Sequence, residues 1–398
     1  MKASFVIPFY GEQIGGGAET QCRRLAENLS ARGVDVEVLT TTLRSLASDW
    51  SHNYWDAGTY EINGVPVRRF EVRPVDGWTF ARVNRKLVAG EPLTLEEEVD
   101  YMNNAVNSDA LYRFIGDNQR GRFYFFIPYL FGTSLNGSAV SPAKSFLIPC
   151  LHDEGYAYMS VTRRMFDRVS GALFNSRAEL RLAQRLYEGL KNTEPILMGE
   201  GVDFISGADP ERFRKNHGLG DGRFMLYVGR RDEGKNVPLL IDYFRRYKEL
   251  KPESDMKLVL IGSGAVDIPA EIADDTIDLG FVSRRDKEDA YAAAEFLCQP
   301  SVMESFSLVI MESWLCGRPV LVHSGCGPTA EHVNESGGGL AFESFPEFFE
   351  AVETLAGEKE LACSMGERGR KYVEANYSWN TICARFKRLF AALEELRF

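Results

Sequence analysis

The sequence predicts an α/β protein built from two doubly wound units, each with a parallel sheet covered by helices. Short apolar runs alternate with amphipathic stretches of helical length, which is the pattern of βαβ units. This alternation begins at residue 3 and begins again near residue 206, after the connecting segment GEGVDFISGADPERF. The 398 residues also exceed what a single hydrophobic core organises. We therefore expect one domain over residues 1–205 and a second over 206–377.

The first half opens with a buried strand, a glycine-rich turn and a helix. The helix is predicted from the apolar spacing of Ala18, Cys22, Leu25 and Leu29, and Gly33 ends it. Residues 76–120 interrupt the rhythm with polar helical sequence, which predicts an inserted or peripheral element. The expected core strands of this half are 3–9, 34–41, 122–129 and 145–151.

The second half repeats the alternation with shorter turns. Its expected helices are 237–250, 284–294 and 306–316, and its expected strands are 223–229, 256–262, 276–282, 294–300 and 319–325. A long amphipathic helix closes the chain at residues 378–398, and we expect it to pack back onto the first domain.

Composition and charge exclude several functional classes. The net charge is −11, with −2 in residues 1–200 and −9 in the remainder, which opposes nonspecific binding to nucleic acid. The seven cysteines are scattered and predict reduced thiols rather than disulfides or a metal site. The N-terminus reads as a strand and no segment reaches transmembrane length, so we expect a cytoplasmic protein. Basic pairs such as Arg68-Arg69 leave contact with an anionic acceptor or the inner membrane face open.

Ligands of doubly wound sheets bind outside the carboxyl ends of the strands, so the loops there carry the expected chemistry. The turn GGGAE over residues 15–19 opens a helix and suits an anion or a leaving group. It does not fit a dinucleotide fingerprint, because the following strand ends in three threonines with no ribose-binding acid. With five histidines and no cysteine near His152, a zinc site is disfavoured.

Three further loops bring ionisable side chains to strand ends. His152 and Asp153 follow a strand of the first half, where a histidine can donate to a substrate hydroxyl or serve only as a capping pair. Arg230 and Lys235 follow the first strand of the second half, and two cations across a turn can converge on a diphosphate. The turns at Gly262 and Val282 could present backbone groups to a ligand.

Glu304 and Glu312 lie in an otherwise apolar stretch, where a carboxylate is costly without a partner. Ser305 is the expected N-cap, which leaves the amides of Phe306, Ser307 and Leu308 as unpaired donors. Eight residues at about 100° per residue place the two glutamates about 80° apart on a helix. This disfavours a hydrolytic carboxylate pair and favours contacts to two parts of one ligand.

Taken together, these motifs resemble the retaining glycosyltransferases of family 4, which have the GT-B fold. The resemblance spans nearly the whole chain and includes Gly201-Val202-Asp203 and the YSW that opens the last helix. It implies two facing Rossmann-like domains around an interdomain cleft, with acceptor binding in the first and nucleotide-sugar binding in the second. It rests on Gly16-Gly17-Ala18-Glu19, His152-Asp153, Arg230, Lys235-Asn236 and the spacing of Glu304 and Glu312.

The resemblance also implies roles for these residues. His152, Arg230, Lys235 and Glu304 would be catalytic, with the two cations on the leaving diphosphate, Glu304 on sugar hydroxyls and His152 beside the transferred sugar. Glu19 and Asp153 would serve the acceptor. The donor would be held by Gly16, Gly17, Gly262, Val282, Phe306, Ser307, Leu308 and Glu312, the last on the ribose.

The resemblance implies a UDP- or GDP-sugar donor, a sugar or lipid-linked sugar acceptor, and no metal or other cofactor. Family members most often act in polysaccharide or glycoconjugate assembly. The sequence departs from the family at Ser307, where glycine is usual, at Glu200, where asparagine is usual, and after Glu19, where a basic residue is often found. Two alternatives stay open: an epimerase of the same fold, and a nucleotide-sugar-binding scaffold without transfer activity. A phosphorylase would need a longer chain.

Overall fold

The computed structural model describes residues 1–188, 190–231 and 233–395, and the chain divides into two compact units. Unit 1 comprises Met1–Gly201 together with the C-terminal segment from Trp379 onward, and unit 2 comprises Val202–Ser378. The chain therefore passes between the units near residue 201 and again near residue 378. The sequence placed these two boundaries at 205 and 377.

Unit 1 contains an eight-stranded sheet in the order β3-β4-β2-β1-β5-β6-β7-β8. Neighbouring strands are parallel except for the antiparallel pair β3 and β4. That hairpin turns at Asn63 and Gly64, both with positive φ, and the sequence analysis missed it. The strands are β1 (Lys2–Val6), β2 (Val36–Thr41), β3 (Gly58–Ile62), β4 (Val65–Phe70), β5 (Arg122–Phe126), β6 (Ser145–Leu147), β7 (Gly171–Phe174) and β8 (Glu194–Leu197).

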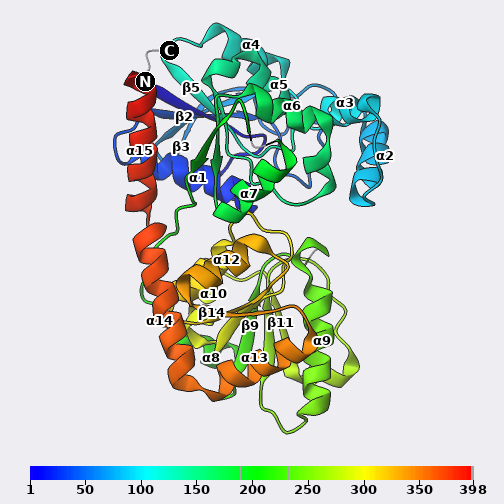
Figure 1. Cartoon of the computed structure of the whole chain (residues 1–398), viewed down its shortest axis with the longest axis vertical. Coiled ribbons are helices and arrows are strands. Elements are labelled where there is room, and N and C mark those ends of the chain that lie inside the picture. The colour runs from blue at the N-terminus through cyan, green and yellow to red at the C-terminus, as the bar shows by residue number, and fades with distance from the viewer. Residues whose placement is uncertain (189, 232, 396–398) are drawn as a thin grey trace. The chain divides into compact units, whose positions relative to one another are not determined.

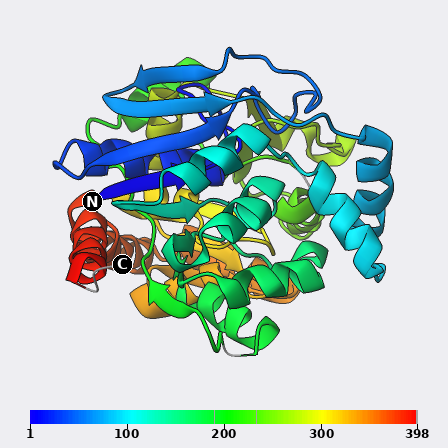
Figure 2. The same ribbon diagram turned by 90° about the horizontal axis from the view of Figure 1, so that it is seen from above.

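Helices cover both faces of this sheet, while α2 and α3 pack against each other and project to one side of unit 1 (Figures 1 and 2). This pair is the first part of the peripheral element expected over residues 76–120, whereas α4 in the same range packs into the core through Leu111 and Ile115. The helices of the N-terminal part are α1 (Gly17–Ser30), α2 (Gly77–Val88), α3 (Leu95–Asn104), α4 (Asp109–Asp117), α5 (Gly132–Val140), α6 (Ser160–Arg168) and α7 (Arg177–Leu186). Short 3₁₀ turns are η1 (Pro142–Lys144) and η2 (Gly155–Tyr158).

Unit 2 contains a six-stranded parallel sheet in the order β11-β10-β9-β12-β13-β14. Counted along the chain, this is the 3-2-1-4-5-6 order of Rossmann-type sheets. The strands are β9 (Phe224–Val228), β10 (Lys257–Ile261), β11 (Thr276–Gly280), β12 (Phe296–Gln299), β13 (Val320–His323) and β14 (Gly339–Phe342). The helical segments are α8 (Pro210–His217), η3 (Glu233–Lys235), α9 (Val237–Leu250), η4 (Ala270–Asp275), α10 (Arg284–Ala293), α11 (Leu308–Leu315), α12 (Gly327–Ser336), α13 (Phe345–Gly357) and α14 (Lys359–Asn376).

The last helix, α15 (Trp379–Glu395), belongs to unit 1 although it follows unit 2 in the chain. Phe386 and Phe390 place their ring centroids 5.0 and 5.9 Å from that of Phe125 on β5. Arg385 donates a hydrogen bond of 2.8 Å to the carbonyl of Met198. Buried aromatic contacts therefore hold the chain end on the first unit, and the final three residues of the expected range 378–398 lie outside the described residues.

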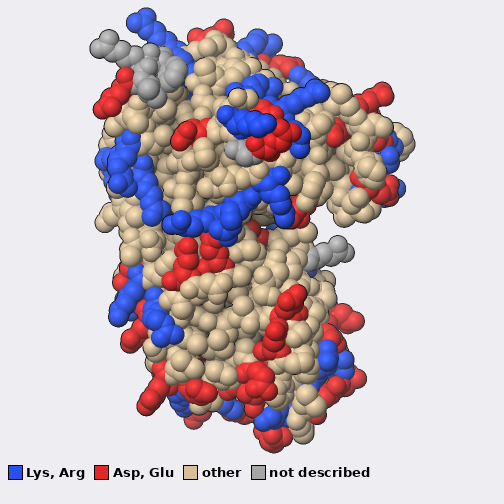
Figure 3. Space-filling model, viewed as in Figure 1, with Lys and Arg blue, Asp and Glu red and all other residues tan. Residues whose placement is uncertain are grey.

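The surface charge differs between the units, as the sequence predicts. On the face drawn in Figure 3, Lys and Arg are prominent on unit 1, whereas Asp and Glu predominate on unit 2. None of the helices in the described ranges is both long and apolar enough to cross a membrane.

Candidate functional site

The candidate site in unit 2 lies where the strand order of its sheet reverses. β9 pairs with β10 on one side and with β12 on the other, so the chain leaves β9 and β12 in divergent directions. Ligands of open α/β sheets bind at the carboxyl ends of such strands. The loop after β9 carries Arg230 and Lys235, and the loop after β12 carries Glu304.

Lys235 and Glu304 form an ion pair across these two loops. The Nζ atom of Lys235 lies 2.7 Å from Oε1 of Glu304, and the side chains are 19% and 11% exposed. Gln299, buried at the end of β12, donates to the same oxygen at 3.2 Å. Asn236, with φ of 56°, donates to the carbonyl of Pro300 at 3.2 Å and so ties the loops together. The sequence predicted the charges but not that they pair.

The two arginines after β9 have different environments. The side chain of Arg231 is only 3% exposed, pairs with Asp278 and donates to the carbonyl of Gly264 at 3.1 Å. Arg230 is exposed, while its backbone carbonyl accepts a hydrogen bond from the hydroxyl of Tyr227. The guanidinium of Arg231 is therefore occupied by contacts within unit 2, whereas the side chain of Arg230 reaches solvent.

The helix after β12 begins later than the sequence predicted. α11 starts at Leu308 and its N-cap is Ser307, not Ser305, so Glu304 precedes the helix. The sequence also predicted Glu304 in the loop before the helix, but the separation of about 80° does not apply, because it assumes helical backbone from Glu304 to Glu312. Glu312 lies just over one turn into α11, not two. Ser307 has φ of 82°, in the left-handed region that favours glycine, which explains why glycine is usual there.

Glu312 is held by two side chains of α10 that the sequence analysis did not single out. Nζ of Lys287 lies 2.7 and 2.8 Å from the two carboxylate oxygens of Glu312. The hydroxyl of Tyr291 donates to Oε2 of Glu312 at 2.8 Å, and burial, with the nearby carboxylate, raises the pKa of Tyr291 well above its usual value. Lys287 and Tyr291 are four residues apart, so they share one helical face. The spacing of Lys287 and Tyr291 in the sequence could have indicated that both side chains point to one partner.

α11 is fixed in place by its tryptophan. Trp314 is fully buried and its indole N–H donates to the carbonyl of Gly338 at 2.8 Å. A Cβ atom on Gly369 of α14 would come within 2.2 Å of the Trp314 ring. The close approach of these helices sets the position of Glu312.

The remaining donor loops predicted in unit 2 have distinct geometries. A Cβ atom on Gly262 would lie 1.8 Å from the carbonyl oxygen of Gly229, so glycine there lets the loops after β9 and β10 touch. The close approach predicted at Gly262 is therefore between two backbones. Val282 lies in the loop between β11 and α10, next to Phe281, whose side chain is 89% exposed.

In unit 1, the glycine-rich turn leads into α1 with Gly16 as its N-cap. Gly16 has φ of 142°, and a Cβ atom there would lie 1.9 Å from the carboxylate of Glu19, which folds back over it. Gly17 is exposed as the first residue of the helix. Arg23 supports the turn by donating to the carbonyls of Gly11, Glu12 and Ile14 at 2.8, 3.0 and 3.3 Å.

His152 and Asp153 lie in the loop that follows β6. Nδ1 of His152 is 3.6 Å from Oε1 of Glu154, which also accepts from the Tyr129 hydroxyl at 2.9 Å. Asp153 pairs with Arg185 at 2.5 Å and accepts from Tyr158 at 2.6 Å. The histidine and the aspartate are therefore neighbours with separate partners, rather than a hydrogen-bonded pair.

A buried carboxyl group supports this loop from below. Glu179 is 1% exposed and accepts from the backbone N–H groups of Leu151 and Asn175, both at 2.6 Å. Burial raises the pKa of Glu179 from 4.5 to about 7. Cys150, with φ of 52°, turns the chain just before Leu151 and His152. Glu179 thus sets the position of the backbone that carries His152.

Among the described residues, no group of three or more His, Cys, Asp or Glu side chains is placed to hold a metal ion. Glu304 and Glu312 each pair with a lysine instead, Glu304 with Lys235 and Glu312 with Lys287. The arrangement offers cations and amides to an anion and carboxylates to hydroxyl groups.

Comparisons with known proteins agree with this chemistry. Residues 209–372 match the family model "Glycosyl transferases group 1". This match lies within unit 2. The trehalose synthase of Rubrobacter xylanophilus is 31% identical over 185 residues, 43% of this chain and 44% of the relative. The chain thus spans under half the length of that relative. An uncharacterized glycosyltransferase of Methanocaldococcus jannaschii is 24% identical over 412 residues, 96% of both chains.

The fold of the whole chain is matched by solved structures. A crystal structure of Anabaena HepE in complex with UDP and glucose has a TM-score of 0.70 at 15% identity, covering 98% of this chain and 100% of that one. The predicted GT-B fold is confirmed.

Proposed function

We propose that the protein is a retaining glycosyltransferase that moves a hexose from a nucleoside diphosphate sugar to a sugar or glycolipid acceptor. The observation that carries this proposal is the Lys235–Glu304 pair at the strand-order reversal of the sheet in unit 2, within the residues that match the glycosyl transferase family model. A cation and a carboxylate 2.7 Å apart offer one site to a phosphate and a neighbouring site to sugar hydroxyls. Relatives named as glycosyltransferases and a neighbour that binds UDP and glucose support it.

The reaction would break the bond between the anomeric carbon and the diphosphate oxygen, and the electron pair would leave with the diphosphate. Lys235 and Arg230 would stabilise this developing negative charge, together with the amides of Phe306, Ser307 and Leu308 at the start of α11. An acceptor hydroxyl would attack the same face of the sugar and pass its proton to the leaving phosphate oxygen. Groups already oriented toward the leaving group lower the barrier because their interaction strengthens in the transition state.

Other residues would bind and orient the substrates. Glu312 would accept hydrogen bonds from the ribose hydroxyls, and Glu304 from hydroxyls of the transferred sugar. Gly16 and Gly17 would present backbone N–H groups to the donor, with Glu19 and Asp153 on the acceptor and His152 beside the reacting sugar. The mechanism needs no protein nucleophile and no metal ion.

A thermal-shift screen with UDP-, GDP-, ADP- and dTDP-hexoses tests the donor class. We expect one nucleotide to raise the melting temperature of the wild type and to do so much less for Lys235→Ala, because ligand binding stabilises the native state. Lys215→Ala is the matched control, since Lys215 is exposed on α8. Donor-dependent products analysed by mass spectrometry then separate transfer to an acceptor from epimerisation of the donor or binding alone.

A further inference from the structure

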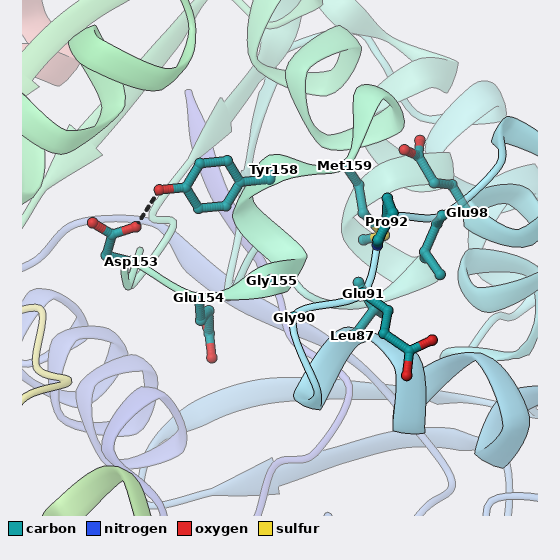
Figure 4. Close-up of a pocket in the computed structure, with 11 residues that line it drawn as sticks. Leu87, Gly90, Glu91, Pro92, Glu98, Asp153, Glu154, Gly155, Tyr158 and Met159 are labelled. Atoms are coloured by element: carbon teal, nitrogen blue, oxygen red, sulfur yellow. Dashed lines mark hydrogen bonds between the residues drawn. The ribbon is translucent and has the colours of Figure 1, made fainter.

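Unit 1 contains a cavity of about 490 Å³ next to the loop that carries His152. The end of α2 and residues 90–93 form one wall, and residues 153–159 form the other (Figure 4). The volume falls in the range of about 300–1,000 Å³ that is usual for small-molecule sites. The cavity is therefore large enough for a sugar acceptor and lies beside a residue of the candidate site.

The two walls are held together by close backbone packing. A Cβ atom on Gly155 would lie 2.5 Å from the carbonyl oxygen of Leu87, so glycine lets η2 touch the end of α2. Glu98 of α3 accepts from the hydroxyl of Ser160 at 2.5 Å and from the backbone N–H of Val161 at 3.1 Å, which fixes the start of α6. The cavity is thus bounded by elements anchored to each other.

The charge of the lining is one-sided. Four carboxylates line the cavity, whereas within the described part of the chain no Lys, Arg or His side chain does; the acids are Glu91, Glu98, Asp153 and Glu154. Two of these acids have a basic neighbour outside the lining: Asp153 pairs with Arg185 at 2.5 Å, and Oε1 of Glu154 lies 3.6 Å from Nδ1 of His152. On α2, Lys86 and Arg82 pair with Glu97 at 2.7 and 3.1 Å.

The lining also offers an aromatic face. The Tyr158 side chain is 61% exposed, and its hydroxyl is turned toward Asp153 (Figure 4). Leu93 and Met159 supply apolar surface beside it. An aromatic ring can pack on the C–H face of a sugar while nearby carboxylates accept hydrogen bonds from the hydroxyl or ammonium groups of that sugar.

We propose that this cavity binds the acceptor, and that the acceptor unit it receives is an uncharged or amine-bearing sugar rather than a phosphorylated one. The inference rests on the proposed glycosyltransferase function. A phosphate in the cavity would face four carboxylates and, among the described lining residues, no cation. Like charges repel more strongly in a partly buried site than in bulk water. An ammonium or a hydroxyl group of a sugar, by contrast, can donate hydrogen bonds to these carboxylates.

The test compares three matched acceptors: methyl glucoside, methyl glucosaminide and methyl glucoside 6-phosphate. With the donor found by thermal shift, we expect kcat/KM for either of the first two to exceed that for the phosphate by at least tenfold. Tyr158→Ala should raise the acceptor KM several-fold and leave the donor KM unchanged. Glu91→Lys should reduce the preference against the phosphate, whereas Glu61→Lys on the distant strand β3 should not.

Donor hydrolysis without an acceptor reports the proposed function separately. If hydrolysis proceeds but the phosphorylated acceptor is used as well as the neutral ones, or Tyr158→Ala and Glu91→Lys behave as wild type, the cavity assignment is overturned while the function stands. Saturation-transfer NMR of the three sugars with the protein and the nucleoside diphosphate gives a second readout. Stronger binding of the phosphorylated sugar would also overturn the assignment.

Discussion

In unit 2 the two candidate glutamates form ion pairs with lysines that lie beside them. In unit 1, by contrast, the glycine turn and the His152 loop are supported by side chains that are not themselves candidate site residues. Lys235 contacts Glu304, and Lys287 contacts Glu312. By contrast, Arg23 supports the glycine turn of unit 1, and Glu179 supports the His152 loop. We infer that substitutions in unit 2 change donor chemistry directly, while many in unit 1 act through backbone position.

The largest expected effect comes from removing a cation of unit 2. A hydrogen bond to a charged group contributes about 1.5–3 kcal/mol, so Lys235→Ala should lower turnover by roughly ten- to a hundredfold. Steady-state kinetics with saturating donor measures this, with Lys215→Ala as the control. Arg230→Ala should act in the same direction. Full activity in either variant, with unchanged stability, would remove the diphosphate role assigned to that residue.

The next prediction concerns Glu179, which supports the His152 loop of unit 1, and the pH dependence of the stability of the protein. Burial raises the pKa of Glu179 from 4.5 to about 7, so the folded state binds this proton more tightly than the unfolded state. Its contribution to stability is therefore full below pH 4.5 and is lost as the pH rises through about 7. Urea unfolding from pH 4.5 to 8 should show a loss of roughly 1–3 kcal/mol that Glu179→Gln removes. An unchanged pH slope in the variant would show that Glu179 is not the titrating group.

A smaller effect tests the pairing around Glu312. Lys287→Met leaves this carboxylate without its cation, so we expect the donor KM to rise roughly fivefold, about 1 kcal/mol, with kcat nearly constant. Lys287→Arg should recover most of the affinity. Arg285→Met, an exposed neighbour on α10, is the control. A fall in kcat at unchanged KM would instead point to a transition-state role for Lys287.

The smallest effect concerns the strained residue at the start of α11. Ser307→Gly relieves a left-handed backbone conformation and should stabilise the protein by about 0.5–1 kcal/mol after the added entropy of the unfolded chain is subtracted. Ser307→Ala keeps the same strain and should show no such gain. Equal melting temperatures for the glycine and alanine variants would contradict this explanation.

The sequence predicts the fold well where apolar periodicity is strong. The helix expected at residues 237–250 is α9, and the strands expected around 224–228 and 257–261 are β9 and β10. It misses the β3–β4 hairpin, although Asn63-Gly64 is a hairpin turn signal, because β3 is largely exposed and has no buried face to produce a pattern. The strands β8 and β14 are missed for the same reason, since β8 has no buried residue and β14 has only one.

The candidate site is predictable as a set of residues but not as a set of contacts. Strand ends identify Lys235 and Glu304 in unit 2, since its sheet brings those two ends to one edge. A strand end of the separate sheet in unit 1 identifies His152. The pairing of Lys287 with Glu312 joins residues 25 positions apart on different helices, and only packing reveals it. The late start of α11 depends on the left-handed backbone at Ser307, which a serine does not signal.

The central claim is tested most directly by incubating the protein with a nucleoside diphosphate hexose and a neutral sugar acceptor and following the products by mass spectrometry. The account predicts an acceptor that gains one hexose, release of the free nucleoside diphosphate, and loss of this product in Lys235→Ala but not in Lys215→Ala. Tight donor binding with neither transfer nor hydrolysis, under every nucleotide and acceptor supplied, would contradict it.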